Sequence, residues 1–463
     1  MRLGYLLAVA FVCSLPLLAQ EEIVGDWYGT LEVPSLPVVF HISETDGNLT
    51  ATLDSPSQGA MGIPIDSVVF DAGHLSLTIA AISGGYEGDL ETAGAIVGSW
   101  SQGGLTLDLT LSRNQEAAAA PRRPQEPQAP FPYEAESVRF ASSAPGVTLA
   151  GTLTLPVSDT PSPAVVLISG SGPQDRDETL VGHRPFLVLA DHLTRHGVGV
   201  LRLDDRGIGE STGSFATATT TDFSDDVLAA VEFLEQRSDI GPIGLVGHSE
   251  GGLVAPMVAN RTSAVRFVVL MAGPGLTGEE ILYRQSVLII KANGGSDEMA
   301  ETNRGVQARL FAALKAEDDV EVARATLREI LLESLPQVST GITDENLEQQ
   351  VEVQLAQLTQ PWFRYFLTYD PLPALRELDC PVLAINGEKD TQVPSQENLD
   401  AIRRALTEGG NADFDIVELP GLNHLLQTAD TGSPNEYASI EETMSPRALQ
   451  AMTDWILARF PVN

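Results

Sequence analysis

The chain has 463 residues and a formal net charge of −36, with 27 Lys and Arg against 63 Asp and Glu, and 43% of its residues are hydrophobic. This length predicts two or three folded units, and the hydrophobic content is ample for large cores. So negative a chain repels nucleic acids and anionic membranes, so we exclude both as partners.

The first twenty residues have the pattern of a secretory signal peptide. An early arginine, Arg2, precedes an apolar run from Leu3 to Ala19 that is short for a membrane span and contains Pro16. The alternative is a membrane anchor. We expect cleavage near Ala19 or Gln20, followed by a periplasmic or extracellular location without membrane insertion.

The chain has two cysteines, and Cys13 lies within the predicted signal peptide. Its removal would leave Cys380 alone, so no intramolecular disulfide is expected. Cys380 lies just before an apolar strand, and we predict that its thiol is buried in the core.

Residues 21–113 alternate between apolar and polar side chains in short segments separated by turns such as Ala72-Gly73. This period of two predicts a small antiparallel all-β domain, a sandwich or barrel of roughly eight strands. Residues 114–133 are rich in Pro and Ala and predict an interdomain linker.

From residue 134 to residue 463, apolar strands alternate with amphipathic helices, which predicts a mostly parallel sheet with helices on both faces. The alternation stops over residues 276–368, where Glu, Ala, Leu, Gln and Arg recur at helical spacing. We interpret this stretch as an inserted helical cap. Strands resume at 382–385 and 414–419.

Residues 244–252 read Gly-Leu-Val-Gly-His-Ser-Glu-Gly-Gly and include an apolar strand that runs into a G-x-S-x-G motif. The glycines of this motif let the backbone turn sharply and leave the serine hydroxyl exposed on a strained elbow. A helix is predicted over 253–259, and its positive amino-terminal end favours a developing oxyanion. Ser249 is therefore the candidate nucleophile.

Ser249 needs a base and an orienting acid, each from a loop at the carboxyl end of a strand. Asp390 follows the apolar strand 382–385, and His424 follows the next strand. In this hypothesis His424 takes the proton from Ser249 and returns it to the leaving group, while Asp390 holds the imidazole tautomer.

Both assignments have alternatives nearby. Glu388 is a second candidate acid, but Asp390 directly precedes the Thr391–Pro394 turn, the position from which a carboxylate reaches the histidine. His248 adjoins the nucleophile, but we expect it to face sideways from the elbow, which makes it a poor base. The remaining histidines are predicted to be structural.

The oxyanion hole is predicted to combine the backbone N–H of Glu250 with one from the glycine-rich loop 169–177. Within that loop we favour the N–H of Ser171, with Gly172 as the next choice. The Glu250 side chain is expected to be solvated or salt-bridged. The loop is not followed by Lys-Ser/Thr, which argues against a phosphate cradle.

Two runs near this loop are dense in charge. They are Asp175-Arg176-Asp177 and Asp204-Asp205-Arg206. We interpret both as local ion pairs and turns rather than as direct contacts to substrate.

Several segments together carry a family resemblance. In chain order they read SGSGPQDRDE, LRLDDRGIGESTG, DFSDDVLAAVEFL, GLVGHSEGG, AINGEKDTQVP and LPGLNHL. The chain from residue 134 to residue 463 resembles the α/β-hydrolase superfamily, in which the nucleophile, acid and base follow in this order. More narrowly it is similar to secreted bacterial esterases grouped with serine aminopeptidase-like and dienelactone-hydrolase-like enzymes.

The resemblance implies hydrolysis of carboxylic esters with no metal and no organic cofactor. One departure is that many superfamily members carry His-Gly before the oxyanion residue, where this chain has Ser169-Gly170. This difference leaves the choice of oxyanion N–H open, but it does not affect the Ser249, Asp390 and His424 assignments.

Three hypotheses for function follow. The first is a serine esterase acting on a small-molecule ester with a short or medium acyl group. The second is a peptidase with the same catalytic residues, in which an acidic pair of the cap, from Glu279-Glu280 or Glu317-Asp318-Asp319, anchors a peptide amino terminus. The third is that the β domain binds a glycan or partner. The sequence leaves the oligomeric state open.

Overall fold

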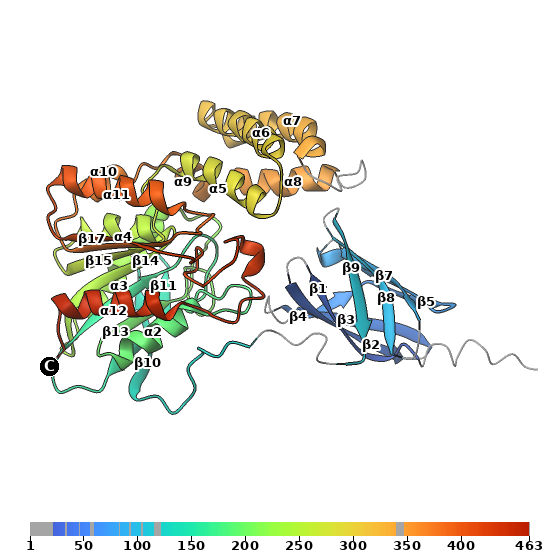
Figure 1. The fold of residues 1–463 in the computed structure, drawn as a ribbon, viewed down its shortest axis with the longest axis horizontal. Helices are drawn as coiled ribbons and strands as arrows, with labels where there is room; N and C mark the ends of the chain where they lie inside the picture. The colour runs from blue at the N-terminus through green and yellow to red at the C-terminus, as the bar shows by residue number, and fades with distance from the viewer. Residues whose placement is uncertain are drawn as a thin grey trace, which may run out of the picture. The chain divides into compact units, whose positions relative to one another are not determined.

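The computed structural model describes residues 22–462 apart from 33–34, 46, 56–59, 83, 92–93, 103–104, 115–121 and 339–346. The predicted signal peptide, residues 1–20, lies outside the described residues. The chain divides into two compact units, Met1–Ala120 and Pro121–Asn463 (Figure 1). This division falls inside the segment predicted as a linker, residues 114–133.

Unit 1 is an antiparallel sheet whose strands lie in the order β4-β3-β2-β1-β9-β8-β7-β6-β5. Its described part contains nine strands, close to the roughly eight predicted. The strands are β1 (Gly25–Glu32), β2 (Ser35–Thr45), β3 (Asn48–Ser55), β4 (Ala60–Ile65), β5 (Ser67–Asp71), β6 (His74–Ile79), β7 (Gly84–Leu90), β8 (Ala95–Gln102) and β9 (Leu105–Ser112). The sheet curls so that β3 lies against β5 and β4 against β6.

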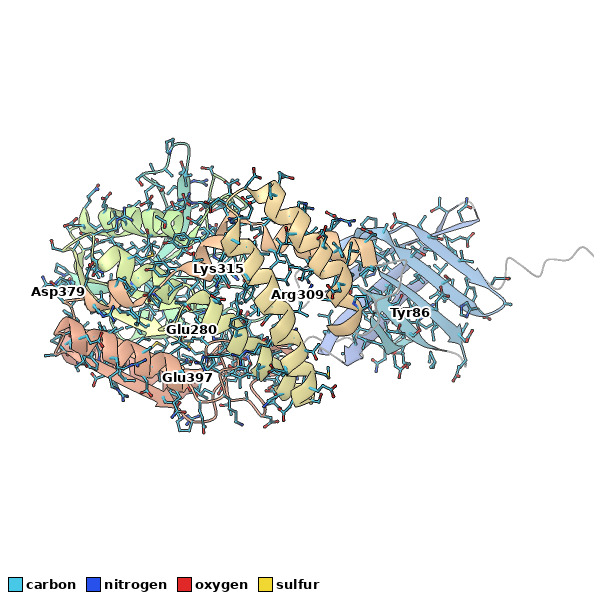
Figure 2. All side chains as sticks on the ribbon, turned by 90° about the horizontal axis from the view of Figure 1, so that it is seen from above. Tyr86, Glu280, Arg309, Lys315, Asp379 and Glu397 are labelled. Atoms are coloured by element: carbon cyan, nitrogen blue, oxygen red, sulfur yellow. The ribbon has the colours of Figure 1, made fainter. Side chains whose placement is uncertain are left out.

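The interior of unit 1 is filled by the alternate side chains that point inward from each strand. The buried Phe40 ring lies 5.9 Å from the ring of Tyr86 and 6.2 Å from that of Trp100. The Tyr86 hydroxyl (Figure 2) lies 3.1 Å from the carbonyl oxygen of Leu109, to which it donates a hydrogen bond. These aromatic contacts give unit 1 a packed core of its own.

Unit 2 contains an eight-stranded sheet in the order β10-β11-β13-β12-β14-β15-β16-β17. The pairs β10–β11 and β11–β13 are antiparallel, and every pair from β13 to β17 is parallel. The strands are β10 (Tyr133–Ala141), β11 (Thr148–Pro156), β12 (Ser162–Ile168), β13 (Gly199–Leu203), β14 (Ile240–His248), β15 (Val265–Met271), β16 (Val382–Gly387) and β17 (Phe414–Leu419).

Helices cover both faces of this sheet. Helices α3 (Thr220–Glu235), α4 (Gly251–Ala259), α10 (Leu372–Arg376) and α11 (Ser395–Gly409) pack on one face, and α2 (Pro185–Arg195) and α12 (Pro446–Arg459) pack on the other. The central strands are largely apolar, as expected where helices cover both faces of a sheet. The predicted mostly parallel sheet with helices on both faces is confirmed. No described helix combines the length and the apolar character needed to span a membrane.

The strand order creates a switch point in the middle of the sheet. Strand β12 lies between β13 and β14, so the chain passes from β12 to one side and returns on the other. At such a point the loops from the carboxyl ends of the strands diverge and leave a crevice in which ligands bind. The loop after β12 and the turn after β14 border this crevice.

The segment predicted as a cap, residues 276–368, holds helices α5 (Gly278–Ala292), α6 (Asp297–Ala316), α7 (Val320–Val338), α8 (Leu347–Leu358) and α9 (Pro361–Thr368). In Figure 1, α6 and α7 form the outer layer, and α5 and α9 lie nearer the sheet. The cap has its own apolar core, which includes Leu314, Leu327 and Leu355.

Ion pairs link the cap helices to each other and to the sheet domain. Lys315 of α6 lies 2.6 Å from Glu279 of α5, and Arg284 of α5 lies 2.9 Å from Glu397 of α11; Lys315 and Glu397 are labelled in Figure 2. All four side chains are partly exposed, so each pair contributes about 0–1 kcal/mol. The apolar contacts therefore dominate the stability of the cap.

The second half of the predicted linker is attached to unit 2. The Arg123 guanidinium donates a hydrogen bond of 2.7 Å to the carbonyl oxygen of Ile440. The Gln125 amide oxygen accepts one of 2.6 Å from the backbone N–H of Thr443. The described residues of this segment, 122–133, thus lie against the sheet domain rather than free of it.

Candidate active site

Ser249 lies on a sharp turn between β14 and α4. Its φ of 51° is in the left-handed region, which a serine adopts only under constraint. A Cβ on Gly247 would lie 2.0 Å from the carbonyl oxygen of Gly251, and one on Gly251 would lie 2.2 Å from that of Ile168. Only glycine fits at these two positions, which explains why the motif permits the elbow.

Asp390 and His424 meet at the carboxyl ends of β16 and β17. The Nδ1 atom of His424 lies 2.7 Å from Oδ2 of Asp390, and both side chains are buried. The other oxygen of Asp390 accepts hydrogen bonds of 2.8 Å from the backbone N–H groups of Gln392 and Val393. These bonds fix the carboxylate so that one oxygen remains for the imidazole.

The alternative acid is arranged differently. Glu388 is exposed, and its Oε2 accepts a 2.9 Å hydrogen bond from the backbone N–H of Gly421. Glu388 therefore holds the start of the base loop, while Asp390 contacts the imidazole of His424. The geometry favours Asp390 as the orienting acid.

Asn423, which sequence reasoning missed, holds the loop that carries His424. Its Oδ1 accepts hydrogen bonds of 3.1 Å from the Leu425 N–H and 2.9 Å from the Gln427 N–H. Asn423 is fully buried, so these bonds replace those that the backbone would make to water. The sequence signal is an asparagine directly before the candidate base, which is typical of a side chain that closes a turn.

The loop after β12 presents backbone N–H groups beside the elbow. The Gly170 N–H donates a 2.7 Å hydrogen bond to Oε1 of Glu178 and is therefore committed within the loop. In the described part of the chain, the N–H groups of Ser171 and Glu250 have no protein acceptor. The two predicted oxyanion donors are thus available, and Ser171 is exposed.

A partly buried carboxylate holds this loop in place. Asp205 accepts hydrogen bonds of 2.9 Å from the Ser169 hydroxyl and 2.9 Å from the Gln174 N–H. Burial raises the pKa of Asp205 to about 7, against the lowering effect of these two bonds. Asp205 therefore holds the loop through these hydrogen bonds rather than through an ion pair.

The Glu250 side chain is neither solvated nor salt-bridged, so that prediction is wrong. The side chain is buried, and its Oε1 accepts hydrogen bonds of 2.7 Å from the Thr220 hydroxyl and 2.7 Å from Nε1 of Trp362. Burial raises the pKa of Glu250 to about 7, although both hydrogen bonds lower it. Because Trp362 belongs to α9, this carboxyl group joins the cap to the nucleophile elbow.

His248 points away from the position of a general base, as predicted. Its Nδ1 lies 2.8 Å from Oε1 of Glu178, and its Nε2 lies 3.1 Å from the backbone carbonyl oxygen of His424. Burial lowers the pKa of His248, but the Glu178 carboxylate outweighs burial, and the net direction is upward. Glu178 was not singled out from the sequence.

The ion pairs predicted for the two charge-dense runs are present. Arg176 lies 2.6 Å from Asp204, and Arg202 pairs with Asp177. The guanidinium of Arg206 lies 2.7 Å from Asp226 of α3. The exception is Asp205, which holds the loop after β12 by hydrogen bonds as described above.

The remaining candidate side chain is Cys380. Cys380 is partly buried, and burial raises the pKa of its thiol to about 11. Within the described ranges, no three His, Cys, Asp or Glu side chains are grouped so as to hold a metal ion.

The sheet order, the serine elbow after β14 and the Asp390–His424 pair after β16 and β17 together define the α/β-hydrolase fold. The model of the alpha/beta hydrolase family matches residues 165–439. The chain belongs to this family.

Among curated proteins, the chain is similar to the esterase EstD of Thermotoga maritima. The two are 26% identical over 312 residues, which is 67% of this chain and 65% of that protein. The chain therefore spans slightly less than two thirds of the relative's length.

Several solved structures resemble this chain. An esterase from Pyrococcus furiosus is 15% identical with a TM-score of 0.43, and the match covers 74% of this chain and 98% of the esterase chain. Est1E from Butyrivibrio proteoclasticus, with bound ferulic acid, is 18% identical with a TM-score of 0.40, covering 69% and 98%. A dienelactone hydrolase from Anabaena variabilis is 14% identical with a TM-score of 0.38, covering 71% and 99%.

Proposed function

We propose that this protein is a serine hydrolase that cleaves carboxylic esters of short or medium acyl groups. The observation that carries the proposal is the buried 2.7 Å hydrogen bond between His424 Nδ1 and Asp390 Oδ2, at the same sheet edge as the strained Ser249 elbow. Ser249 is the nucleophile, His424 the general base and acid, and Asp390 the orienting carboxylate.

The chemistry follows from which nitrogen carries the proton. Asp390 holds a proton on Nδ1 of His424, which leaves Nε2 as a base. In the first step Nε2 accepts the Ser249 hydroxyl proton while the serine oxygen bonds to the ester carbonyl carbon. The tetrahedral intermediate then expels the alcohol, to which His424 gives that proton, and the acyl group remains on Ser249.

The second half-reaction repeats these roles with water as the nucleophile. His424 accepts a proton from a water molecule as the water oxygen attacks the acyl carbon. It then gives the proton to the Ser249 oxygen as the carboxylic acid product departs. In both steps the negative oxygen is stabilised by the backbone N–H groups of Glu250 and Ser171, of which each removed donor typically costs about 10²–10³ in rate. The reaction leaves the enzyme unchanged.

Two lines of support favour an ester over a peptide substrate. The Thermotoga relative is itself named an esterase. The acidic residues of the cap, which a peptidase would need to anchor an amino terminus, have partners within the chain. Glu279 pairs with Lys315, and Glu280 closes the capping box at the start of α5.

In the second acidic cluster of the cap, Glu317 and Asp319 also have partners within the chain, whereas Asp318 is exposed. The Glu317 carboxylate accepts a 2.9 Å hydrogen bond from the Asp319 N–H, and Asp319 in turn accepts one of 2.9 Å from the N–H of Glu321 at the start of α7. These carboxylates hold the turn between α6 and α7, which further weakens the peptidase hypothesis.

The glycan-binding hypothesis for unit 1 also receives no support. Proteins that bind sugars commonly stack aromatic rings on them, and such rings must be exposed. In the described part of unit 1, Trp27, Phe40, Tyr86 and Trp100 are buried in its core, whereas Tyr28 and Phe70 are partly exposed. Neither tryptophan ring is therefore free to stack on a sugar, and we assign the chemistry of the chain to unit 2.

The deciding experiment compares the full chain with Ser249→Ala on p-nitrophenyl acetate and butyrate. We expect turnover by the wild type and a loss of at least about 10³-fold in kcat for the variant. A panel of acyl chain lengths and aminoacyl amides then tests specificity. Persistent turnover by Ser249→Ala, or faster amide than ester cleavage, would overturn the proposal.

Export belongs to the same proposal and rests on the pattern of residues 1–20. Amino-terminal sequencing of the protein secreted by its host should begin near Gln20. Recovery of the chain inside the cell with Met1 still in place would remove this part of the proposal.

A further inference from the structure

His248, the residue before the proposed nucleophile, contacts both loops that surround Ser249. One ring nitrogen lies 2.8 Å from the Glu178 carboxylate in the loop after β12, and the other lies 3.1 Å from the backbone carbonyl oxygen of His424. The two imidazole rings, of His248 and His424, are 4.8 Å apart. His248 thus lies between the predicted oxyanion loop and the predicted base.

The partners of His248 determine its protonation. Both ring nitrogens face oxygen acceptors, whereas a neutral imidazole donates from only one nitrogen. An imidazolium donates from both, and Glu178 supplies the opposite charge at 2.8 Å. Both side chains of this pair are buried, so a charge on either one requires the other.

The same carboxylate oxygen also fixes the oxyanion loop. Glu178 Oε1 accepts a 2.7 Å hydrogen bond from the Gly170 N–H in addition to its contact with His248. A Cβ on Gly170 would lie 3.2 Å from Cβ of Ser249, so this part of the loop touches the elbow. Glu178 has a φ of 52°, a strained conformation for glutamate that its buried contacts maintain.

We propose that His248 and Glu178 are positioning residues of the hydrolase. They form a buried imidazolium–carboxylate pair that holds the backbone of the base loop at His424 and the oxyanion loop at Gly170 in fixed positions around Ser249. This inference rests on the proposed function. His248 acts through His424 and Glu178, and it contacts neither the substrate nor the transferred proton.

This role predicts a particular kinetic signature. Positioning errors of about 1 Å in a catalytic group cost on the order of 10²-fold in rate. The pair does not line a substrate contact, so ground-state binding stays the same. Removal of either member should therefore lower kcat and leave KM unchanged.

The experiment measures kcat and KM of the full chain on p-nitrophenyl acetate. For His248→Asn and Glu178→Ala we expect kcat to fall about 10- to 100-fold with KM within about twofold of the wild type. Glu178→Gln keeps an amide oxygen that can accept from Gly170 but loses the charge that pairs with His248, so its kcat should lie between those of Glu178→Ala and the wild type. The matched control is His192→Asn, a partly buried histidine on α2.

Two kinetic outcomes would overturn the inference. One is kcat within twofold of the wild type for both His248→Asn and Glu178→Ala. The other is a rise in KM without a fall in kcat, which would mean that the pair contacts the substrate. Circular dichroism of each variant verifies folding before the kinetic comparison.

A second readout does not depend on activity. Nuclear magnetic resonance of the ¹⁵N-histidine-labelled wild-type chain at pH 7.5 should contain an imidazolium signal that is absent from Glu178→Gln. His183 serves as the neutral reference, because burial lowers its pKa to about 4. If no imidazolium signal disappears in Glu178→Gln, the pair is not charged and the inference fails. A wild type without esterase activity but with this signal would refute the proposed function alone.

Discussion

Each of the two units is built on a β-sheet, but the strand directions differ, and this difference determines where polar side chains gather. In unit 2, the strands from β13 to β17 are parallel, so the loops that follow them all leave from one edge. In unit 1, neighbouring strands are antiparallel, and successive loops alternate between two edges. Only the parallel arrangement gathers loops from several strands around one point.

The polar groups follow this difference. Unit 2 buries Asp390, His424 and Glu250 near the ends of its strands. In unit 1, His41 pairs with Asp26 and Asp54 from neighbouring strands, and its side chain is 37% exposed. The comparison teaches that strand direction, more than the number of charged residues, decides where buried chemistry can form.

The largest expected effect is on the acid of the proposed triad. In Asp390→Asn the side chain can still accept from Gln392 and Val393, but it no longer carries the charge that orients and stabilises protonated His424. We expect kcat on p-nitrophenyl acetate to fall about 10³–10⁴-fold. Glu388→Gln is the control and should stay within about threefold. Equal losses in the two variants would refute the choice of Asp390.

The next largest effect is on the stability of unit 1 alone. Phe40→Ala removes a fully buried ring from the core of unit 1 and should cost about 3–5 kcal/mol of the free energy of unfolding of that unit. Scanning calorimetry should show one transition shifted and one unchanged, and kcat should stay the same. A fall in kcat at temperatures where only unit 1 has unfolded would break the comparison.

The third effect tests the buried carboxyl group of Glu250. Its pKa of about 7 in the folded chain lies above the ordinary glutamate pKa of 4.5, so the stabilising neutral form is fully present below pH 4.5 and is lost as pH rises through 7. Glu250→Gln stays neutral throughout. The free energy of unfolding of unit 2 in the variant, minus that in the wild type, should therefore be about 2–3 kcal/mol larger at pH 9 than at pH 5.

Urea unfolding at the two pH values measures this difference for Glu250→Gln. The control is Glu232→Gln, an exposed glutamate on α3. An identical change for both variants between pH 5 and pH 9 would mean that the Glu250 carboxyl group is not held in an apolar environment.

Much of the candidate site was predictable because its signals are local. Ser249, Asp390 and His424 each follow directly on an apolar strand, and the carboxyl ends of parallel strands meet at one edge. The fold class was predictable for the same reason, since the alternation of strands and helices is read along the chain. The assigned catalytic roles remain predictions until the variants are measured.

The contacts around the site were not predictable, because they join residues far apart in the chain. The segment 175–178 offers three carboxylates of similar chemistry, and only the path of the loop assigns Glu178 to His248 and Asp177 to Arg202. The error for Glu250 has the same origin, since its partner Trp362 lies on a cap helix. That Glu250 follows Ser249 in the sequence does not indicate which residues of the fold will cover its side chain.

The hydrogen bond between Trp362 and Glu250 has a consequence for how such an enzyme can change over generations. Trp362 belongs to the inserted cap, yet it supplies a donor to a carboxyl group next to the proposed nucleophile. A substitution at Trp362 would leave that buried carboxyl group with one donor fewer. Related sequences should therefore replace these two residues together, so a change at Trp362 in the cap should be accompanied by a change at Glu250 in the elbow.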